Sequence, residues 1–205
     1  MGKTKKGPEG IRNMGKNRKR NGNRNSAVLP AVLMALVMAL TGCGQRGKNR
    51  NEEYGEVIAG LGDDEQFALE DIGENYDVLF TTDMTYEDGA GHHAALRAAV
   101  YYVIDGQACS MGRVESMGTA YPVSYGKRCI YTASEHSLQI YEIDTAKQQL
   151  SLKAEYEIIF DETDRISYRC TKDGQEEMIS EEAYAKIYKE YEKSTVVSFG
   201  YGAGV

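Results

Sequence analysis

The stretch at residues 96–116, "LRAAVYYVIDGQACSMGRVES", contains two runs of strand-forming residues separated by Asp105-Gly106. Aromatic and β-branched side chains favour strands. An Asp-Gly pair between two such runs is a strong signal of a β-hairpin. The sequence therefore predicts antiparallel strands at 96–105 and 107–116.

Strand-like segments continue on both sides of this hairpin. They cover residues 66–72, 76–82, 120–125, 128–134, 136–144, 150–160 and 165–170, with a last short segment at 195–200. Short strands that follow one another across turns are typical of an antiparallel meander and not of βαβ units. We expect a mainly β (α+β) domain, either a meander or a partly closed sheet or barrel, with helices at its end or over one face.

Two segments carry apolar residues at the helical spacing i, i+3, i+4, i+7. The first segment holds Tyr54, Val57, Ile58 and Leu61, and the second holds Tyr184, Ile187, Tyr188 and Tyr191. Ser180 precedes the second segment as an N-cap residue. The sequence predicts a short N-terminal helix and an amphipathic C-terminal helix over 181–192.

Residues 1–42 have the organisation of a secretory signal peptide. Residues 1–26 carry nine basic side chains and one acidic one, and residues 27–42 carry no charge. A basic region followed by an apolar one is typical of such signals. The apolar run spans about 16 residues, fewer than the roughly 20 that a membrane-spanning helix needs.

The apolar run ends in Leu40-Thr41-Gly42-Cys43. This motif resembles the bacterial lipobox. The resemblance implies that the Cys43 sulfur receives a diacylglyceryl group and that the chain is cut before Cys43, because a lipobox marks this site. Several acyl chains hold a protein at a membrane far better than one. We expect a protein anchored by lipid to the cell membrane and facing outside; an ordinary secretory signal followed by a cysteine is the alternative.

The charge of the chain changes sharply after the signal. Residues 43–51, "CGQRGKNRN", form a basic, glycine- and asparagine-containing segment that predicts a flexible tether. Residues 51–205 hold 12 basic and 30 acidic side chains, a net charge of −18. Such a surface repels phosphate backbones, so we expect no nucleic-acid partner. The expected organisation is a signal peptide (1–42), a tether (43–51) and an acidic β-rich domain (52–205), whose acidity serves solubility or the binding of cationic partners.

Possible metal ligands gather between residues 83 and 93. They are Asp83, Glu87, Asp88, His92 and His93. Carboxylates and imidazoles could hold a divalent metal if this loop folds back on itself. No H-E-x-x-H motif accompanies them, and a solvated hairpin loop is the competing interpretation.

No nucleophile motif or phosphate-binding loop occurs elsewhere, and no cofactor is expected. The leading hypothesis is a non-enzymatic surface lipoprotein that binds an envelope protein or a small ligand. The alternative is a metal-dependent envelope hydrolase that uses the 83–93 loop. Three cysteines, Cys109, Cys129 and Cys170, follow the signal in strand-like surroundings. Buried free thiols are favoured for them, and one disulfide remains open.

Two further segments carry a family resemblance, "EQFALEDIGENYDVLF" at 65–80 and "EEMISEEAYAKIYKEYE" at 176–192. They resemble a broad group of lipobox-containing lipoproteins from Gram-positive, clostridia-like bacteria, in which a "YAFxDIxGDGxxEL" element precedes a strand meander and a late helix. The resemblance implies an architecture and no activity. Members with a D-x-[ND]-G-D-G-x-x-E loop carry a calcium-type site. Residues 71–77 are shorter and lack that pattern, so a tight turn is favoured over a cation held by Asp71, Glu74 and Asp77.

Overall fold

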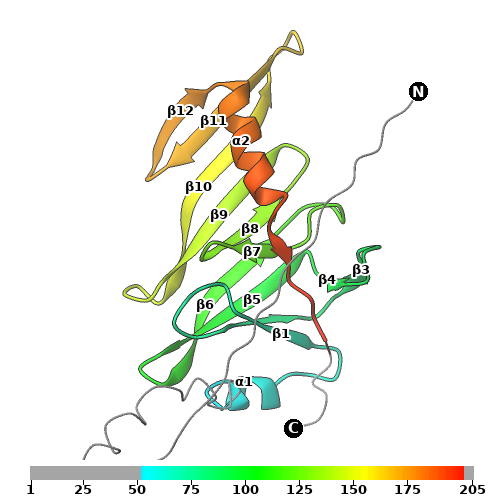
Figure 1. The fold of residues 1–205 in the computed structure, drawn as a ribbon, viewed down its shortest axis with the longest axis vertical. Helices are drawn as coiled ribbons and strands as arrows, with labels where there is room; N and C mark the ends of the chain where they lie inside the picture. The colour runs from blue at the N-terminus through cyan, green and yellow to red at the C-terminus, as the bar shows by residue number, and fades with distance from the viewer. Residues whose placement is uncertain (1–51, 201–205) are drawn as a thin grey trace, which may run out of the picture. The chain divides into compact units, whose positions relative to one another are not determined.

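The structure, a computed structural model, describes residues 52–200, which form two helices and thirteen strands (Figure 1). All strand pairings are antiparallel. The prediction of a mainly β, antiparallel domain with two helices is confirmed. Over residues 52–200 the sheets are open and form no closed barrel.

The strands divide into two large sheets and one small one. The four-stranded sheet has the order β1 (Gln66–Glu70), β2 (Val78–Thr82), β5 (Arg97–Ile104) and β6 (Gln107–Glu115). The seven-stranded sheet has the order β12 (Gln175–Ile179), β11 (Ile166–Lys172), β10 (Gln149–Phe160), β9 (Ser137–Asp144), β8 (Cys129–Ala133), β7 (Ser124–Gly126) and β13 (Thr195–Val196). β3 (Tyr86–Glu87) and β4 (His93–Ala94) form a separate hairpin.

The main hydrophobic core lies between the two large sheets. The four-stranded sheet contributes Phe80, Val100 and Met111, and the seven-stranded sheet contributes Ile130. Each of these side chains is at most 2% exposed. Burial of apolar surface at about 25 cal/mol per Å² makes this layer the main source of stability.

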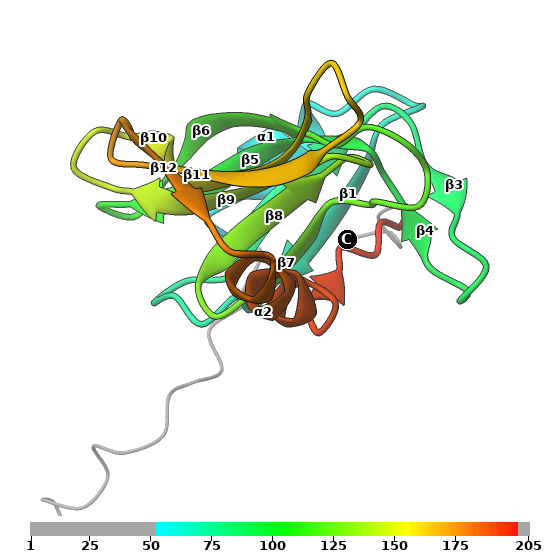
Figure 2. The same ribbon diagram turned by 90° about the horizontal axis from the view of Figure 1, so that it is seen from above.

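The two helices cover the outer faces of the two sheets. α1 (Gly55–Ala59) lies by the four-stranded sheet, where the preceding Tyr54 packs with Leu79 and Val103. α2 (Glu181–Tyr191) lies on the seven-stranded sheet, with Tyr191 packed against β8 and β9 residues. Figures 1 and 2 show α2 on one face of this sheet, with β5 and β6 on the other.

Side-chain and backbone contacts link the two large sheets. The Tyr125 hydroxyl on β7 donates a hydrogen bond of 2.7 Å to Glu70 Oε2 on β1. Phe67 on β1 forms an isolated β-bridge with Gly200. These contacts close the edge of the four-stranded sheet against the C-terminal segment of the described chain.

Two strands carry register shifts. In the β5–β6 pair, Val100 lies opposite Gly112 and Tyr101 lies opposite Ser110, so Met111 is an extra residue. In the β9–β10 pair the shift falls between Leu152 and Ala154, with Lys153 as the extra residue. Such bulges bend a strand and redirect its side chains.

The sequence did not predict three strands, β3, β4 and β12. The β12 sequence, "QEEMI", places two glutamates side by side and lacks a clear polar–apolar alternation. Its strand structure comes from pairing with β11, where Lys172 and Gln175 flank the Asp173-Gly174 turn. The other predicted elements agree to within a few residues, and the Ser180 N-cap is confirmed because its hydroxyl accepts a 3.2 Å bond from the Ala183 N–H.

Candidate binding site on the seven-stranded sheet

The face of the seven-stranded sheet opposite α2 changes from apolar to polar along the sheet. Near β8 and β9 it packs into the main core through Ile130 and Tyr141. Farther along β10, after the bulge at Lys153, the same face carries polar side chains. The bulge matters because it shifts the alternation of β10 by one residue.

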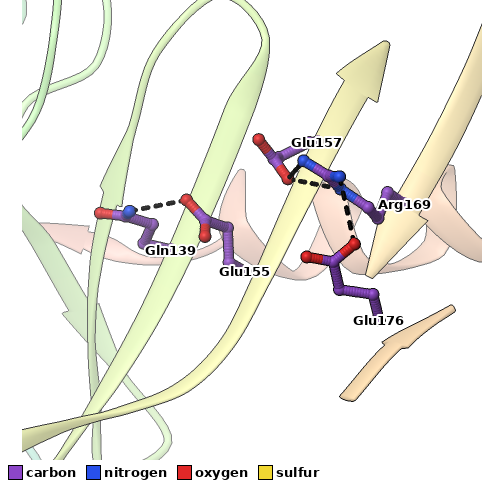
Figure 3. Close-up of polar contacts among 5 residues, drawn as sticks. All are labelled: Gln139, Glu155, Glu157, Arg169 and Glu176. Carbon is purple, nitrogen blue, oxygen red and sulfur yellow. Dashed lines mark hydrogen bonds and ion pairs between the residues drawn. The ribbon is translucent and has the colours of Figure 1, made fainter. Parts of the chain in front are cut away.

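Five side chains on this face form two neighbouring bonded groups, Gln139 with Glu155 and Arg169 with Glu157 and Glu176, which we together call the open polar row (Figure 3). Its members are Gln139 on β9, Glu155 and Glu157 on β10, Arg169 on β11 and Glu176 on β12. Gln139 pairs with Glu155 and Glu157 pairs with Arg169 across neighbouring strands. Directly opposed residues of an antiparallel pair lie on the same face, so strand register brings the row together.

Gln139 connects the row to the core. Its side-chain Nε2 donates a 2.7 Å hydrogen bond to Glu155 Oε1. Its Oε1 accepts hydrogen bonds from the Tyr141 hydroxyl at 2.8 Å and the Thr132 hydroxyl at 3.3 Å. Thr132 is only 1% exposed, so one of the two hydroxyls that hold Gln139 is buried.

Arg169 is the centre of the other half of the row. Its Nε and Nη2 donate to the same oxygen, Glu157 Oε2, at 2.9 and 2.7 Å. Its Nη1 donates to Glu176 Oε2 at 3.2 Å. The Glu157 carboxylate raises the pKa of Arg169 above its ordinary value, first by its hydrogen bonds and then by its charge.

The row combines an excess of negative charge with access to solvent. It contains three carboxylates and one guanidinium. The Glu157 and Arg169 side chains are 28% and 32% exposed, and the Glu176 side chain is 62% exposed. Accessibility therefore increases toward the β12 edge. The row has no nucleophilic side chain, and its chemistry is that of ionic and hydrogen-bond recognition.

The predicted ligands at 83–93 do not gather into one site. Asp83 binds Arg97, with oxygen–nitrogen distances of 3.0 and 2.8 Å. Asp88 Oδ2 lies 2.7 Å from His92 Nδ1. Glu87 and His93 face each other across the β3–β4 pair. No three His, Cys, Asp or Glu side chains within residues 52–200 are placed to hold a metal ion.

Asp88 serves instead as the organising residue of its loop. Its Oδ1 accepts hydrogen bonds from the backbone N–H groups of Ala90 and His92, at 2.8 and 3.0 Å. The hydrogen bond with the His92 ring is the main cause that lowers the Asp88 pKa from 3.8 to about 2. The hydrolase hypothesis would require this carboxylate to leave these partners.

The turn at 71–77 is a tight turn, as the sequence favoured. Asp71 Oδ1 accepts a 2.9 Å bond from the Gly73 N–H, which is an Asx-type turn. Glu74 binds the Arg128 guanidinium through both of its oxygens, at 2.9 and 2.8 Å. Two of the three carboxylates considered for a cation are therefore used by the fold.

A concave surface lies beside the C-terminal end of α2. It is an open cleft of about 500 Å³, lined among others by Asp88, Pro122, Tyr188, Tyr191 and Glu192. Tyr191 is only 9% exposed, since it belongs to the packing between α2 and the sheet. The tyrosines of this cleft thus serve the packing of α2 on the sheet.

The cysteines of the described domain are unpaired. Cys129 and Cys170 are buried and Cys109 is half-buried, and all three are free thiols. Burial is the main cause that raises the Cys129 pKa. The preference for free thiols is confirmed for these three residues.

Several predicted features lie outside the described residues. They are the signal peptide at 1–42, the motif Leu40, Thr41, Gly42 and Cys43, and the tether at 43–51. Neither helix within residues 52–200 has the length and apolar content needed to cross a bilayer.

Comparisons of the chain with protein-family models, with curated proteins and with solved structures found no match. The open polar row is therefore interpreted from its geometry. Sequence reasoning missed it because its members come from four strands. Only the spacing of Glu155 and Glu157, two residues apart, signals that they share a face.

Proposed function

We propose that this protein is a lipid-anchored module of the bacterial cell envelope that faces outside and binds a cationic partner at the open polar row. The lipobox-like motif ending at Cys43 supports the anchor. The resemblance to lipobox-containing lipoproteins supports the same location. The partner is a protein segment that carries lysine or arginine.

The observation that carries the binding proposal is the charge of the row. The row holds three carboxylates and one guanidinium, and Arg169 binds only two of the carboxylates, Glu157 and Glu176. Glu155 has only the Gln139 amide as its partner among the row's side chains. A protonated amine or guanidinium from a partner would donate to these carboxylates and offset the excess negative charge. Partly desolvated pairs of this kind contribute more than pairs on an open surface.

The net charge of the domain favours the same partner chemistry. Residues 51–205 carry −18, so their field attracts a basic partner from a distance and repels an acidic one. Binding should therefore weaken as salt increases, because salt screens exposed charges over about 10 Å at 0.1 M.

The binding site is tested by cross-linking on whole cells. A photo-reactive residue is placed at Thr171, which lies between Glu155 and Glu176 in the strand register. The double variant Glu155→Gln plus Glu176→Gln should reduce capture of a partner by about tenfold or more. It leaves the Glu157–Arg169 pair intact.

The matched control removes the same charge elsewhere. Glu135→Gln plus Glu162→Gln changes two exposed carboxylates outside the row and should leave capture unchanged. Capture that is equal in the row variant and in the wild type would overturn the proposed site.

The anchor is tested by Cys43→Ala. Without the thiol no thioether can form, so the variant should collect as unlipidated precursor or as released protein. Cell fractionation and mass spectrometry of the N-terminal peptide measure this. Retention of the variant in the membrane at the wild-type level would contradict the anchor.

A further inference from the structure

We infer that the partner binds as an added β-strand along the β12 edge, as an extended segment with basic side chains at alternate positions. This inference rests on the proposed function and specifies how the partner is recognised.

β12 is an exposed edge of the seven-stranded sheet. Among the strands of residues 52–200 it pairs with β11 alone. Gln175, Glu176, Glu177 and Met178 are all exposed, and Met178 is 62% exposed. An exposed edge strand presents unpaired N–H and C=O groups and can take up a further strand.

The other edges of the two large sheets are less available among the described residues. β13 spans only two residues, and β1 is bridged to Gly200 through Phe67. β6 lies in contact with β10. β12 is thus the edge that offers an accessible five-residue strand.

The hairpin turn decides which backbone groups of β12 point outward. The two-residue loop Asp173-Gly174 has φ values of 51° and 74°, as a type I′ turn requires. Such a loop makes Lys172 and Gln175 a hydrogen-bonded pair, and hydrogen-bonded pairs alternate from there. The N–H and C=O groups of Glu176 and Met178 therefore point away from β11, toward the open edge.

The side chains of the same two residues lie on the face of the open polar row. Glu176 accepts a hydrogen bond from Arg169, and Met178 is directly opposite Arg169 in the strand register. Glu177 lies on the other face. Alternate residues of an added strand share one face, so lysine or arginine at alternate positions places the basic side chains beside Glu176, on the face of the open polar row.

The same carboxylates oppose pairing with a second copy of the chain. In a two-fold antiparallel pair with full overlap, Glu177 would lie opposite Glu177 of the other copy. A shift of two residues, which keeps every side chain on its face, would place Glu176 opposite Glu176 of the other copy. Like charges directly opposite are destabilising, so a basic strand from another protein is the favoured occupant.

The test uses the full chain with Cys43→Ala and a synthetic probe, the capped peptide (Lys-Val)₃. Met178→Pro removes the outward N–H and leaves the β11 ladder in place, since proline is tolerated where an edge N–H faces solvent. Met178→Ala is the matched control, because it loses the same side chain and keeps the N–H. Calorimetric titration should show a loss of affinity of about tenfold or more for Met178→Pro relative to Met178→Ala.

Two measurements keep the inference testable if Met178→Pro does not fold. Bound peptide should slow hydrogen exchange of the Glu176 and Met178 amides in the Cys43→Ala chain, with little change at Glu177, which already faces β11. The double variant Glu176→Lys plus Glu177→Lys should bind (Glu-Val)₃ more tightly than (Lys-Val)₃, the reverse of the preference expected for the wild-type edge. Equal affinity of Met178→Pro and Met178→Ala, or unchanged exchange at Glu176 and Met178, would overturn strand addition.

These results separate the inference from the proposed function. Partner capture that is lost in the Glu155→Gln plus Glu176→Gln variant, together with equal peptide affinity of the two Met178 variants, overturns strand addition and leaves the proposed function standing. Capture unchanged in that row variant overturns the proposed function itself.

Discussion

Asp88 shows how one carboxylate can look like a metal ligand and act as a structural residue. Both of its oxygens are bound within the loop between β3 and β4, by two backbone N–H groups and the His92 ring. Each of these contacts favours the ionised carboxylate. The loop is therefore held by the charged form of Asp88.

The contribution of Asp88 to stability should depend on pH. The Asp88 pKa is lowered from 3.8 to about 2 by its hydrogen bonds, first of all by that with His92. A depressed folded-state pKa adds stability above pH 4, and this contribution is lost as the pH falls through 2. The destabilisation caused by Asp88→Asn should therefore be largest near pH 5 and shrink toward pH 2. Denaturant unfolding across this range measures it.

The control for this prediction is Asp63→Asn, which changes an exposed carboxylate outside the loop. The difference in unfolding free energy between Asp63→Asn and the wild type should vary less with pH. A constant gap between the wild type and Asp88→Asn from pH 5 to pH 2 would count against the role given to Asp88.

Residue types alone could identify candidate groups and not their partners. Asp83, Asp88, His92 and His93 stand close in sequence, and from spacing alone they could share an ion. In the structure, Asp83 binds Arg97, fourteen positions along the chain, and Asp88 binds His92. The choice between these partners depends on strand positions that spacing does not specify.

Among the elements, β6 depends on a single glycine. Gly112 lies at the register shift of the β5–β6 pair and has a φ of +115°. This left-handed backbone turns the neighbouring Met111 into the core, where it is 2% exposed. A side chain at Gly112 would meet nothing within 4 Å, so the requirement for glycine comes from the backbone alone.

Gly112→Ala should therefore destabilise the domain by about 1–3 kcal/mol, the usual cost of a non-glycine residue in a sparsely populated backbone region. Gly55→Ala is the matched control. Gly55 also has open space around it but lies in α1 without a positive φ, and alanine favours helices. Chemical denaturation of both variants measures the difference. Equal stability of the two variants would show that the bulge tolerates a side chain.

Some local sequence signals were sufficient to predict a turn or strand, and others were not. The Asp105-Gly106 turn was predictable because aspartate and glycine tolerate the positive φ values that this hairpin turn requires, here 51° and 80°. β12 was not predictable from its sequence, because glutamates are poor strand formers. It forms a strand because it pairs with β11. The open polar row was unpredictable for a similar reason. It depends on the register of four strands and on the bulge at Lys153.

At the scale of the whole molecule, the sequence predicted the class and not the layering. The meander divides after β6, where residues 116–123 lead from the four-stranded to the seven-stranded sheet. This crossing places the core between two sheets and one helix on each outer face. Local patterns report that a strand is half-buried, but they do not report which partner buries it.

The whole chain also allows a direct test of the metal hypothesis. We expect elemental analysis of the purified protein to find less than stoichiometric divalent metal, because Asp83 and Asp88 are bound to Arg97 and His92. The double variant His92→Ala plus His93→Ala should have the same metal content as the wild type. A stoichiometric metal that this variant loses would favour the envelope hydrolase.

Tyr54 determines where a pulling force enters the domain of a chain that is anchored at Cys43, as proposed. The Tyr54 ring is 1% exposed under the four-stranded sheet, and its hydroxyl donates a 2.6 Å hydrogen bond to the Asp77 carbonyl. Within the described residues, a pulling force that arrives from the tether reaches this ring before it reaches any strand. Tyr54 would then bear the tension, so that shear at the cell surface passes through its packing against Leu79 and Val103 into β2 and β5 and relieves α1, which follows Tyr54 in the chain.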